Sequence, residues 1–259
     1  MTAAAASPED LDLAGELVRE AGALAAKMLA EGLETRHKSS ISDVVSDADQ
    51  AAEELISRRL IAERPGDGLV GEEGARQPGG RTWYIDPVDG TYNFLSKVGI
   101  WCSAVGLTDD DGLVLGAVYH PVADELWLAG RGRRTTCNGV PVEPLTDRPL
   151  AEISIGSYLP PSMLVKDRVE RIAPLLNAIS GAATLRVIGS GSIELASVAG
   201  GRIGASLHVG TLPWDWVPGA ALVEAAGGVT RIVEHRDRRW HVAGNRQAVD
   251  EISTAILAV

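Results

Sequence analysis

Two aspartates, Asp86 and Asp89, follow directly after an apolar, strand-like run in the first half of the chain. Pro87 fixes one backbone angle between them and Gly90 permits close backbone approach, so the turn can hold both carboxylates toward one point. The amides of Gly90 and Thr91 can then face an anion. An all-oxygen environment of this kind suits a hard cation such as magnesium. The motif therefore indicates metal-assisted chemistry on an anionic substrate.

Asp, Pro and Gly are also ordinary turn formers, and that explanation would suffice for this motif alone. Three further acidic positions, Asp49, Glu72 and Asp215, each lie beside an apolar strand or at a helix start. Each has a plainer explanation as a capping residue, and Asp49 completes a formal capping box with Ser46. Their combination with the aspartate pair favours a site built from several carboxylates.

The composition of the chain limits the classes of protein to which this site can belong. The 259 residues are 45% hydrophobic and 23% charged, enough for one large domain or two closely packed ones. Cys102 and Cys137 are too few for a disulfide framework, so we expect free thiols in a reducing compartment. No leader-like start and no run of roughly 20 apolar residues is present, so we expect a cytoplasmic protein with no membrane partner. A net charge of −11 argues against nucleic-acid binding, and cations would have to mediate any contact with phosphate.

The elements that must position the carboxylates follow from hydrophobic spacing. Helices are expected over residues 11–29 and from Ser46 to about residue 60, followed by strands at 69–71, 82–85, 103–107, 113–119 and 125–129. This first half, residues 1–145, is predicted to be an α+β unit with helices on a mostly antiparallel sheet, and it holds most of the metal-binding motifs.

A shift in composition near Pro144 marks the expected boundary to a second, α/β half over residues 146–259. Strands are expected at 153–157, 185–188 and 229–233, and helices at 169–179, 192–198, 217–226 and 248–257. This half is predicted to contribute the substrate pocket and Asp215.

Three motifs stand in a fixed order along the chain: Gly71-Glu72-Glu73, the run 83–94, and Trp214-Asp215 at the head of a small-residue helix that ends at Gly227-Gly228. In this order they resemble the inositol monophosphatase family, and weaker similarity covers nearly the whole length. The resemblance implies a layered αβαβα sandwich of the inositol monophosphatase and fructose bisphosphatase type. It also implies a magnesium-dependent phosphatase that acts on a small phosphorylated metabolite and forms a homodimer.

The same resemblance assigns roles to residues. Two to three magnesium ions would be held by Glu72, Asp86, the Val88 carbonyl, Asp89 and Asp215. Thr91, supported by Asp49, would orient and help deprotonate the attacking water, with Glu72 and Asp89 completing the catalytic set. The substrate would meet Lys38, Asp89, Gly90, Thr91, Ser190, Gly191, His208 and Asp215.

The aspartate pair also invites comparison with haloacid-dehalogenase-like phosphatases, which attack phosphate with the first of two aspartates. In those enzymes one residue separates the aspartates, whereas two separate Asp86 from Asp89. The spacing therefore favours attack by an activated water, with no covalent phosphoenzyme.

The substrate is less well specified. In the inositol-handling members that this chain resembles, an Asp stands at the position of Gly204 and a Glu stands at the position of His208. This chain has neither acid. A neutral His accepts one hydrogen bond, and a charged His could contact a second anionic group; it could equally be a half-buried strand residue without a ligand. Inositol monophosphate is the default substrate, histidinol phosphate and phosphoadenosine phosphate stay open, and a catalytically silent metal- and phosphate-binding protein is the alternative from another class.

Overall fold

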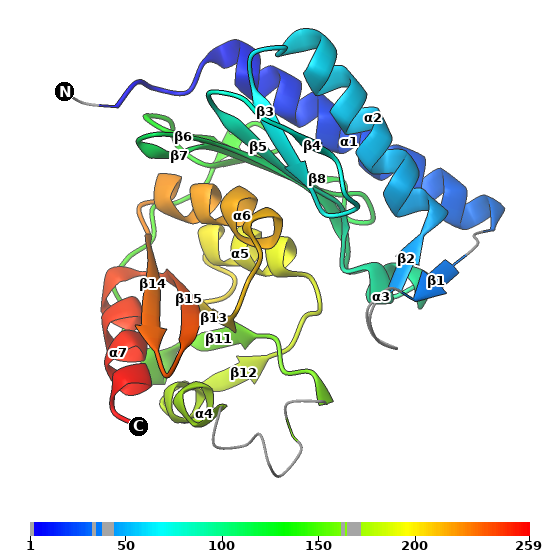
Figure 1. The fold of residues 1–259 in the computed structure, drawn as a ribbon. Helices are drawn as coiled ribbons and strands as arrows, with labels where there is room; N and C mark the ends of the chain where they lie inside the picture. The colour runs from blue at the N-terminus through cyan, green and yellow to red at the C-terminus, as the bar shows by residue number, and fades with distance from the viewer. Residues whose placement is uncertain (1–2, 33–34, 38–43, 162–163, 165–171) are drawn as a thin grey trace.

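The computed structural model describes residues 3–32, 35–37, 44–161, 164 and 172–259. Its elements stack in five alternating layers of helices and sheets, as Figure 1 shows. Two N-terminal helices cover an eight-stranded sheet, two central helices separate it from a five-stranded sheet, and two further helices lie against the outer face of the second sheet. The αβαβα sandwich expected from the resemblance is confirmed.

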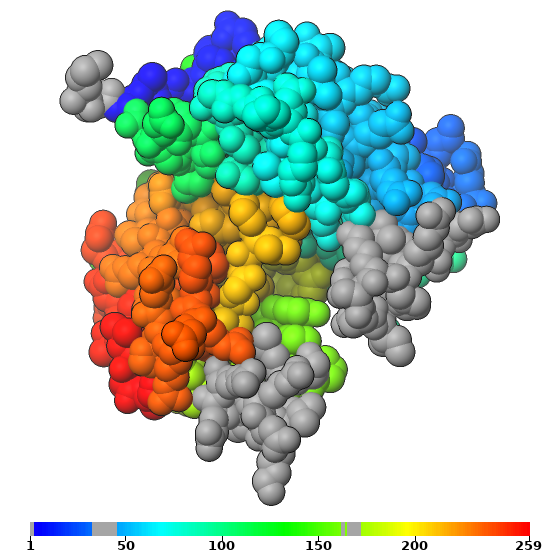
Figure 2. Space-filling model, viewed as in Figure 1, coloured from blue at the N-terminus to red at the C-terminus, as the bar shows by residue number. Residues whose placement is uncertain are grey.

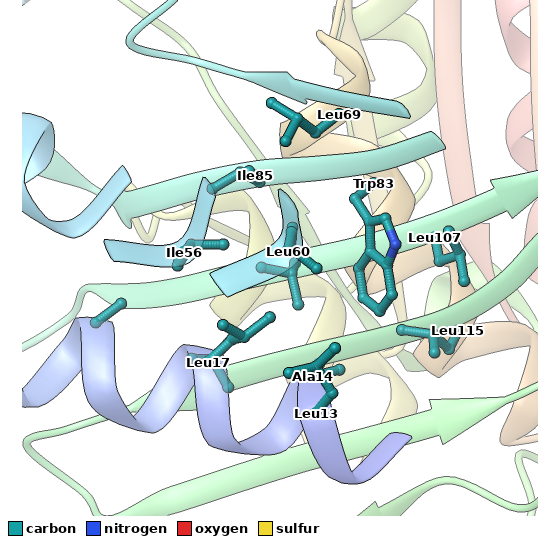
Figure 3. Packing of buried hydrophobic residues seen from close by; sticks show 14 of the residues in the cluster. Leu13, Ala14, Leu17, Ile56, Leu60, Leu69, Trp83, Ile85, Leu107 and Leu115 are labelled. Carbon is teal, nitrogen blue, oxygen red and sulfur yellow. The ribbon is translucent and has the colours of Figure 1, made fainter. Parts of the chain in front are cut away.

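The outer helices of the first half are α1 (Pro8–Glu31) and α2 (Asp47–Glu63). Ser7 caps α1 by accepting from the amide of Asp10, and Ser46 and Asp49 form the expected capping box of α2. Both helices present their apolar faces to the sheet, where Leu17, Ile56 and Leu60 belong to the same buried cluster as Trp83 (Figure 3). Burial of this cluster fixes α2, and with it Asp49, against the sheet.

The eight-stranded sheet has the order β10-β9-β8-β7-β6-β5-β3-β4. Its strands are β3 (Gly68–Gly71), β4 (Arg76–Gln77), β5 (Thr82–Asp89), β6 (Cys102–Asp109), β7 (Gly112–His120), β8 (Glu125–Gly130), β9 (Thr136–Cys137) and β10 (Val140–Pro141). Only β3 and β5 pair in parallel among them, so the mostly antiparallel sheet is confirmed. A separate two-stranded sheet joins β1 (Thr35–His37) to β2 (Val44–Ser46).

The central layer consists of α5 (Gly191–Ala199) and α6 (Pro213–Ala225). Small residues let α6 pack closely on the first sheet and on its neighbour α5. A Cβ at Gly116 would lie 2.0 Å from the Pro218 carbonyl oxygen, and one at Gly219 would lie 2.3 Å from the Leu195 side chain. These contacts bring the head of α6, with Asp215, beneath the first sheet.

The five-stranded sheet has the order β12-β11-β13-β15-β14. Its strands are β11 (Ser154–Ser157), β12 (Thr184–Arg186), β13 (Ala205–Val209), β14 (Val229–His235) and β15 (Arg238–Gly244), and α4 (Ala173–Ser180) and α7 (Arg246–Leu257) cover it. The sequence did not predict β15, whose Trp240 is fully buried. Figure 2 shows the first half of the chain above and the second half below. No helix among the described residues is long and apolar enough to cross a bilayer.

Candidate active site

The aspartate turn lies at the end of β5, where the strand pairing with β6 changes register between Asp86 and Asp89. Residues three apart on a regular strand point to opposite faces, and a register shift of this kind can re-aim a side chain. Gly90 follows with a φ of 93°, and a Cβ there would lie 3.0 Å from the Gly189 carbonyl oxygen. The turn therefore requires glycine, and it leads into the short helix α3 (Thr91–Leu95).

Asp86 is an almost fully buried carboxylate of the site. It is 1% exposed, and its Oδ1 atom has no hydrogen-bond partner among the described residues. Burial, followed by the charges of Glu72, Asp89, Asp215 and Asp49, raises its pKa well above the ordinary value. The five predicted acidic residues are thus close enough to act on one another.

Asp89 is tied to the central layer. Its Oδ1 accepts from the Gly191 amide at 3.1 Å and its Oδ2 accepts from the Ser192 amide. Burial raises its pKa, although these amides act in the opposite direction. The helix α5 therefore fixes a carboxylate from the other half of the chain, a long-range contact that the local motif could not reveal.

Asp215 lies in the first turn of α6, where its Oδ2 is 3.4 Å from the Leu212 amide. Burial and then the charge of Asp89 raise its pKa to about 6, against smaller lowering effects that include hydrogen bonds from Leu212 and Asp86. Its capping role and its place in the carboxylate cluster coexist.

Thr91 and Asp49 meet as expected from the sequence. Thr91 Oγ1 lies 3.1 Å from Asp49 Oδ1 and 3.0 Å from the Val88 carbonyl oxygen, so its one proton can go to either acceptor. Ser46 donates to Asp49 Oδ2 from both its amide, at 2.9 Å, and its hydroxyl. Burial is the largest influence on Asp49 and raises its pKa, which makes the carboxylate a stronger base.

Glu72 follows β3 and borders the same cavity. Its loop is held by Glu53, a residue that the sequence analysis missed. Glu53 is 4% exposed and accepts from the amides of Glu73 and Ala75, each at 2.8 Å. The signal was its position four residues after Asp49, on the same buried face of α2.

A cavity of about 810 Å³ is lined by several of these groups and by a second set of residues. We call the part of its lining formed by Glu72, Asp89, Gly90, Thr91 and Asp215 the catalytic end, after the roles expected for these residues. We call the part formed by Tyr158, Glu194, Ser206, His208 and Trp216 the far end. The size and mixed lining suit a small organic ligand.

The expected substrate residues are distributed unevenly around this cavity. Ser190 and Gly191 border it, but the Gly191 amide is bound to Asp89 and the Ser190 hydroxyl accepts from the Ile193 amide at 3.4 Å. His208 lies on β13 with Nε2 2.7 Å from Glu194 Oε1. Gly204 leaves no room for a side chain, because a Cβ would lie 2.3 Å from Ile153. Lys38 lies outside the described residues.

The carboxylates fit a hard divalent cation. They are oxygen donors, they raise one another's pKa, and Asp86 offers a buried oxygen that no described group satisfies. No group of three or more His, Cys, Asp or Glu side chains in the described part of the chain is close enough to form a metal site as it stands. The cluster therefore fits a cation by its chemistry and charge.

Comparison with known proteins agrees with this chemistry. The model of the inositol monophosphatase family matches residues 8–254. An inositol-1-monophosphatase of Bacillus subtilis is 30% identical over 86% of this chain and 85% of its own length. The extragenic suppressor protein suhB of Bartonella henselae has a similar structure, with a TM-score of 0.85 and 25% identity over 96% of this chain and 98% of that one. The inositol monophosphate-bound structure of SaIMPase-II gives a TM-score of 0.80 and 25% identity over 95% and 94%.

These matches extend across both halves of the chain and include all the residues that form the cavity. The chain belongs to the inositol monophosphatase family, a metal-dependent family of phosphoric monoester hydrolases that act on small phosphorylated substrates.

Proposed function

We propose that this protein is a magnesium-dependent phosphatase that cleaves a small phosphate monoester by attack of water. Inositol monophosphate is the substrate that we propose by default. The observation that carries the proposal is the buried carboxylate cluster of Asp86, Asp89 and Asp215 at the edge of the same cavity as the Thr91–Asp49 pair. The similar SaIMPase-II binds inositol monophosphate, which supports this choice of substrate.

The residues that would hold two to three magnesium ions are Glu72, Asp86, Asp89 and Asp215, together with the Val88 carbonyl. Bound magnesium supplies Lewis-acid chemistry, since it offsets phosphate charge and makes water a better nucleophile. The chain supplies the positions: α5 fixes Asp89, α6 fixes Asp215, and Glu53 fixes the loop of Glu72.

Thr91 and Asp49 would handle the proton of the attacking water. When Thr91 donates to Asp49, the lone pairs of its Oγ1 are free to accept a hydrogen bond from a water in the cavity. The proton can then pass through the hydroxyl to Asp49, whose raised pKa favours its acceptance. A protein that only bound phosphate would not need this relay, so the pair argues against a silent binder.

Gly90 and Thr91 would present their amides to the substrate phosphate, and Lys38 would add positive charge. These assignments, like a cytoplasmic location and a homodimer, rest on the family resemblance. Val98 and Val122 are 45% and 64% exposed, and a Cβ at Gly99, which follows Val98, would lie 3.0 Å from Val122, so this region offers apolar side chains for such a dimer. Light scattering after size exclusion measures the dimer directly.

Phosphate release from inositol monophosphate, histidinol phosphate and phosphoadenosine phosphate, with and without magnesium, tests the proposal. We expect release from inositol monophosphate that stops when the metal is chelated. Faster release from either of the other two would keep the reaction class and replace the substrate. Absence of release from all three, by a protein that melts cooperatively and binds magnesium, would favour the silent binder.

A further inference from the structure

Glu194 is a buried acid that the catalytic scheme leaves unused. It lies on α5 at 1% exposure, beside Gly156, where a Cβ would approach its carboxyl carbon to 2.2 Å. Its Oε1 accepts from the Ser206 hydroxyl and lies 2.7 Å from His208 Nε2. The glycine thus makes room for a carboxylate at the far wall of the cavity.

A charged carboxylate removed from water needs compensation. His208 is the one basic side chain that pairs with Glu194 in the described part of the chain. Burial lowers the pKa of His208, but the charge and hydrogen bond of Glu194, with the charges of Asp215 and Asp89, raise it above the ordinary value. The pair therefore favours a protonated imidazole.

The hydrogen bond between His208 and Glu194 also determines which ring nitrogen of His208 can gain or lose a proton. A carboxylate only accepts, so Nε2 keeps its hydrogen whether the ring is charged or neutral. Nδ1 makes no hydrogen bond to a described residue, and it is not among the fully buried polar atoms that lack a partner. It is therefore the atom that His208 can offer to a ligand, since the residue borders the cavity.

The groups around His208 are few and come from four elements. Glu194 lies on α5, Asp215 on α6 and Asp89 on β5, and His241 lies directly opposite on β15. Burial, followed by the charges of Arg239 and His208, lowers the pKa of His241 to about 4, so this second imidazole stays neutral. The positive charge on this wall belongs to His208.

We propose that Glu194 and His208 form a leaving-group subsite, in which Nδ1 of a protonated His208 donates a hydrogen bond to an anionic oxygen on the leaving alcohol. The inference rests on the proposed phosphatase function and extends its substrate range beyond inositol monophosphate, to phosphate monoesters whose leaving group carries a second anion, such as a carboxylate. Glu194 is a positioning residue here, because it fixes the ring and its proton without reaching the ligand.

The test uses two esters that differ only in this group, glucose 1-phosphate and glucuronic acid 1-phosphate. Each competes with p-nitrophenyl phosphate in the presence of magnesium, and the ratio of the two inhibition constants is measured against pH. Below about pH 6.5 we expect the carboxylate ester to bind roughly tenfold more tightly, as a charge-assisted hydrogen bond allows. The ratio should fall toward one as the pH rises through the raised pKa of His208, where Nδ1 loses its proton.

His208→Gln should bring the ratio to about one at every pH, and Glu194→Gln should move its midpoint to lower pH. His235→Gln is the control, because His235 binds the carbonyl of Val259 away from the cavity and should leave the ratio unchanged. A wild-type ratio near one, or an unaltered ratio in His208→Gln, would overturn the subsite. Should the protein release no phosphate from p-nitrophenyl phosphate or from any of the three esters tested for the proposed function, that function has failed. Calorimetry with both glucose-derived esters and magnesium then decides the subsite, and equal affinities reject it.

Discussion

The two ends of the cavity differ in whether their buried carboxylates have a basic partner. At the catalytic end Asp86, Asp89 and Asp215 lie together, and each carboxyl has its pKa raised. At the far end Glu194 is equally buried but lies against His208, an imidazole with a raised pKa. The first end carries uncompensated negative charge, whereas the second end supplies its own counter-charge.

This difference separates what the ends can do. Like charges that the chain does not balance favour cations from outside, so under the proposed function the catalytic end would serve any phosphate ester that arrives with magnesium. The Glu194–His208 pair balances its own charge, so it favours no cation, and it leaves Nδ1 of His208 to hydrogen-bond a ligand. Changes at the catalytic end should therefore affect all substrates alike, and changes at the far end should affect substrates selectively.

The largest expected effect is that of Asp86→Asn. The substitution keeps the shape but removes a charge that would bind metal, so turnover should fall by roughly 10³-fold for every ester. The metal-free protein should melt at the same or a higher temperature, because a buried like charge has been removed. Phosphate release at saturating magnesium and melting in EDTA measure the two effects.

Asp89→Asn is the matched comparison. It should lose as much activity, but its amide NH₂ would face the Gly191 or Ser192 amide, so the metal-free protein should also be destabilised, by about 1–3 kcal/mol. Equal melting temperatures for the two variants would contradict the idea that α5 holds Asp89 through its amides.

Thr91→Ala should have the next largest effect. Loss of the hydroxyl beside Asp49 removes the path of the water proton and should lower kcat by about 10²-fold for all esters. Thr91→Ser keeps the hydroxyl and should retain most of the activity. An alanine variant as active as the serine variant would remove Thr91 from the reaction.

The catalytic end was largely predictable from the sequence because its information is local. Asp86, Pro87, Asp89 and Gly90 lie in one turn, and Ser46 with Asp49 forms a capping box that the structure contains. The order of helical and strand-like spacing predicted the α+β and α/β halves, whereas the layered sandwich was implied by the family resemblance. Hydrophobic periodicity is a property of short segments, and most of these elements are short and regular.

The far end could not be derived in this way, because its parts meet only in the folded chain. Glu194 and His208 lie fourteen residues apart on α5 and β13, and nothing in either segment marks the other as its partner. Glu53 was hidden for a similar reason: a glutamate on a helix is usually solvent-exposed, and only packing against β3 reveals that it binds two loop amides.

Glu53→Gln should have an intermediate effect confined to metal binding. One of the two bonds from the Glu73 and Ala75 amides would face an NH₂ group, so the loop that carries Glu72 should loosen. We expect the magnesium concentration for half-maximal activity to rise by about tenfold, with little change in kcat at saturation. Glu54→Gln, at an exposed position on the same helix, is the control. A fall in kcat without a change in magnesium requirement would contradict this role.

The smallest expected effect is the pH dependence of stability. The two ends should lose stability in different pH ranges. Asp215 has a pKa raised from 3.8 to about 6, so between these values the folded protein binds more protons than the unfolded chain. Stability from this group is therefore present at low pH and is lost as the pH rises through about 6. His208 also has a raised pKa, but its contribution is lost only as the pH rises above its ordinary value of 6.5.

In EDTA the melting temperature should accordingly fall by a few degrees between about pH 4 and 6, and again, by less, above about pH 6.5. Magnesium should abolish the first decline, because a bound cation favours the ionised carboxylates. Asp86→Asn should make the first decline shallower, and His208→Gln should remove the second with only a small effect on the first, because the charge of His208 has a minor influence on the pKa of Asp215. If one variant altered both declines equally, the two ends would have to be treated as a single titrating cluster, and the separation between a common catalytic end and a selective far end would fail.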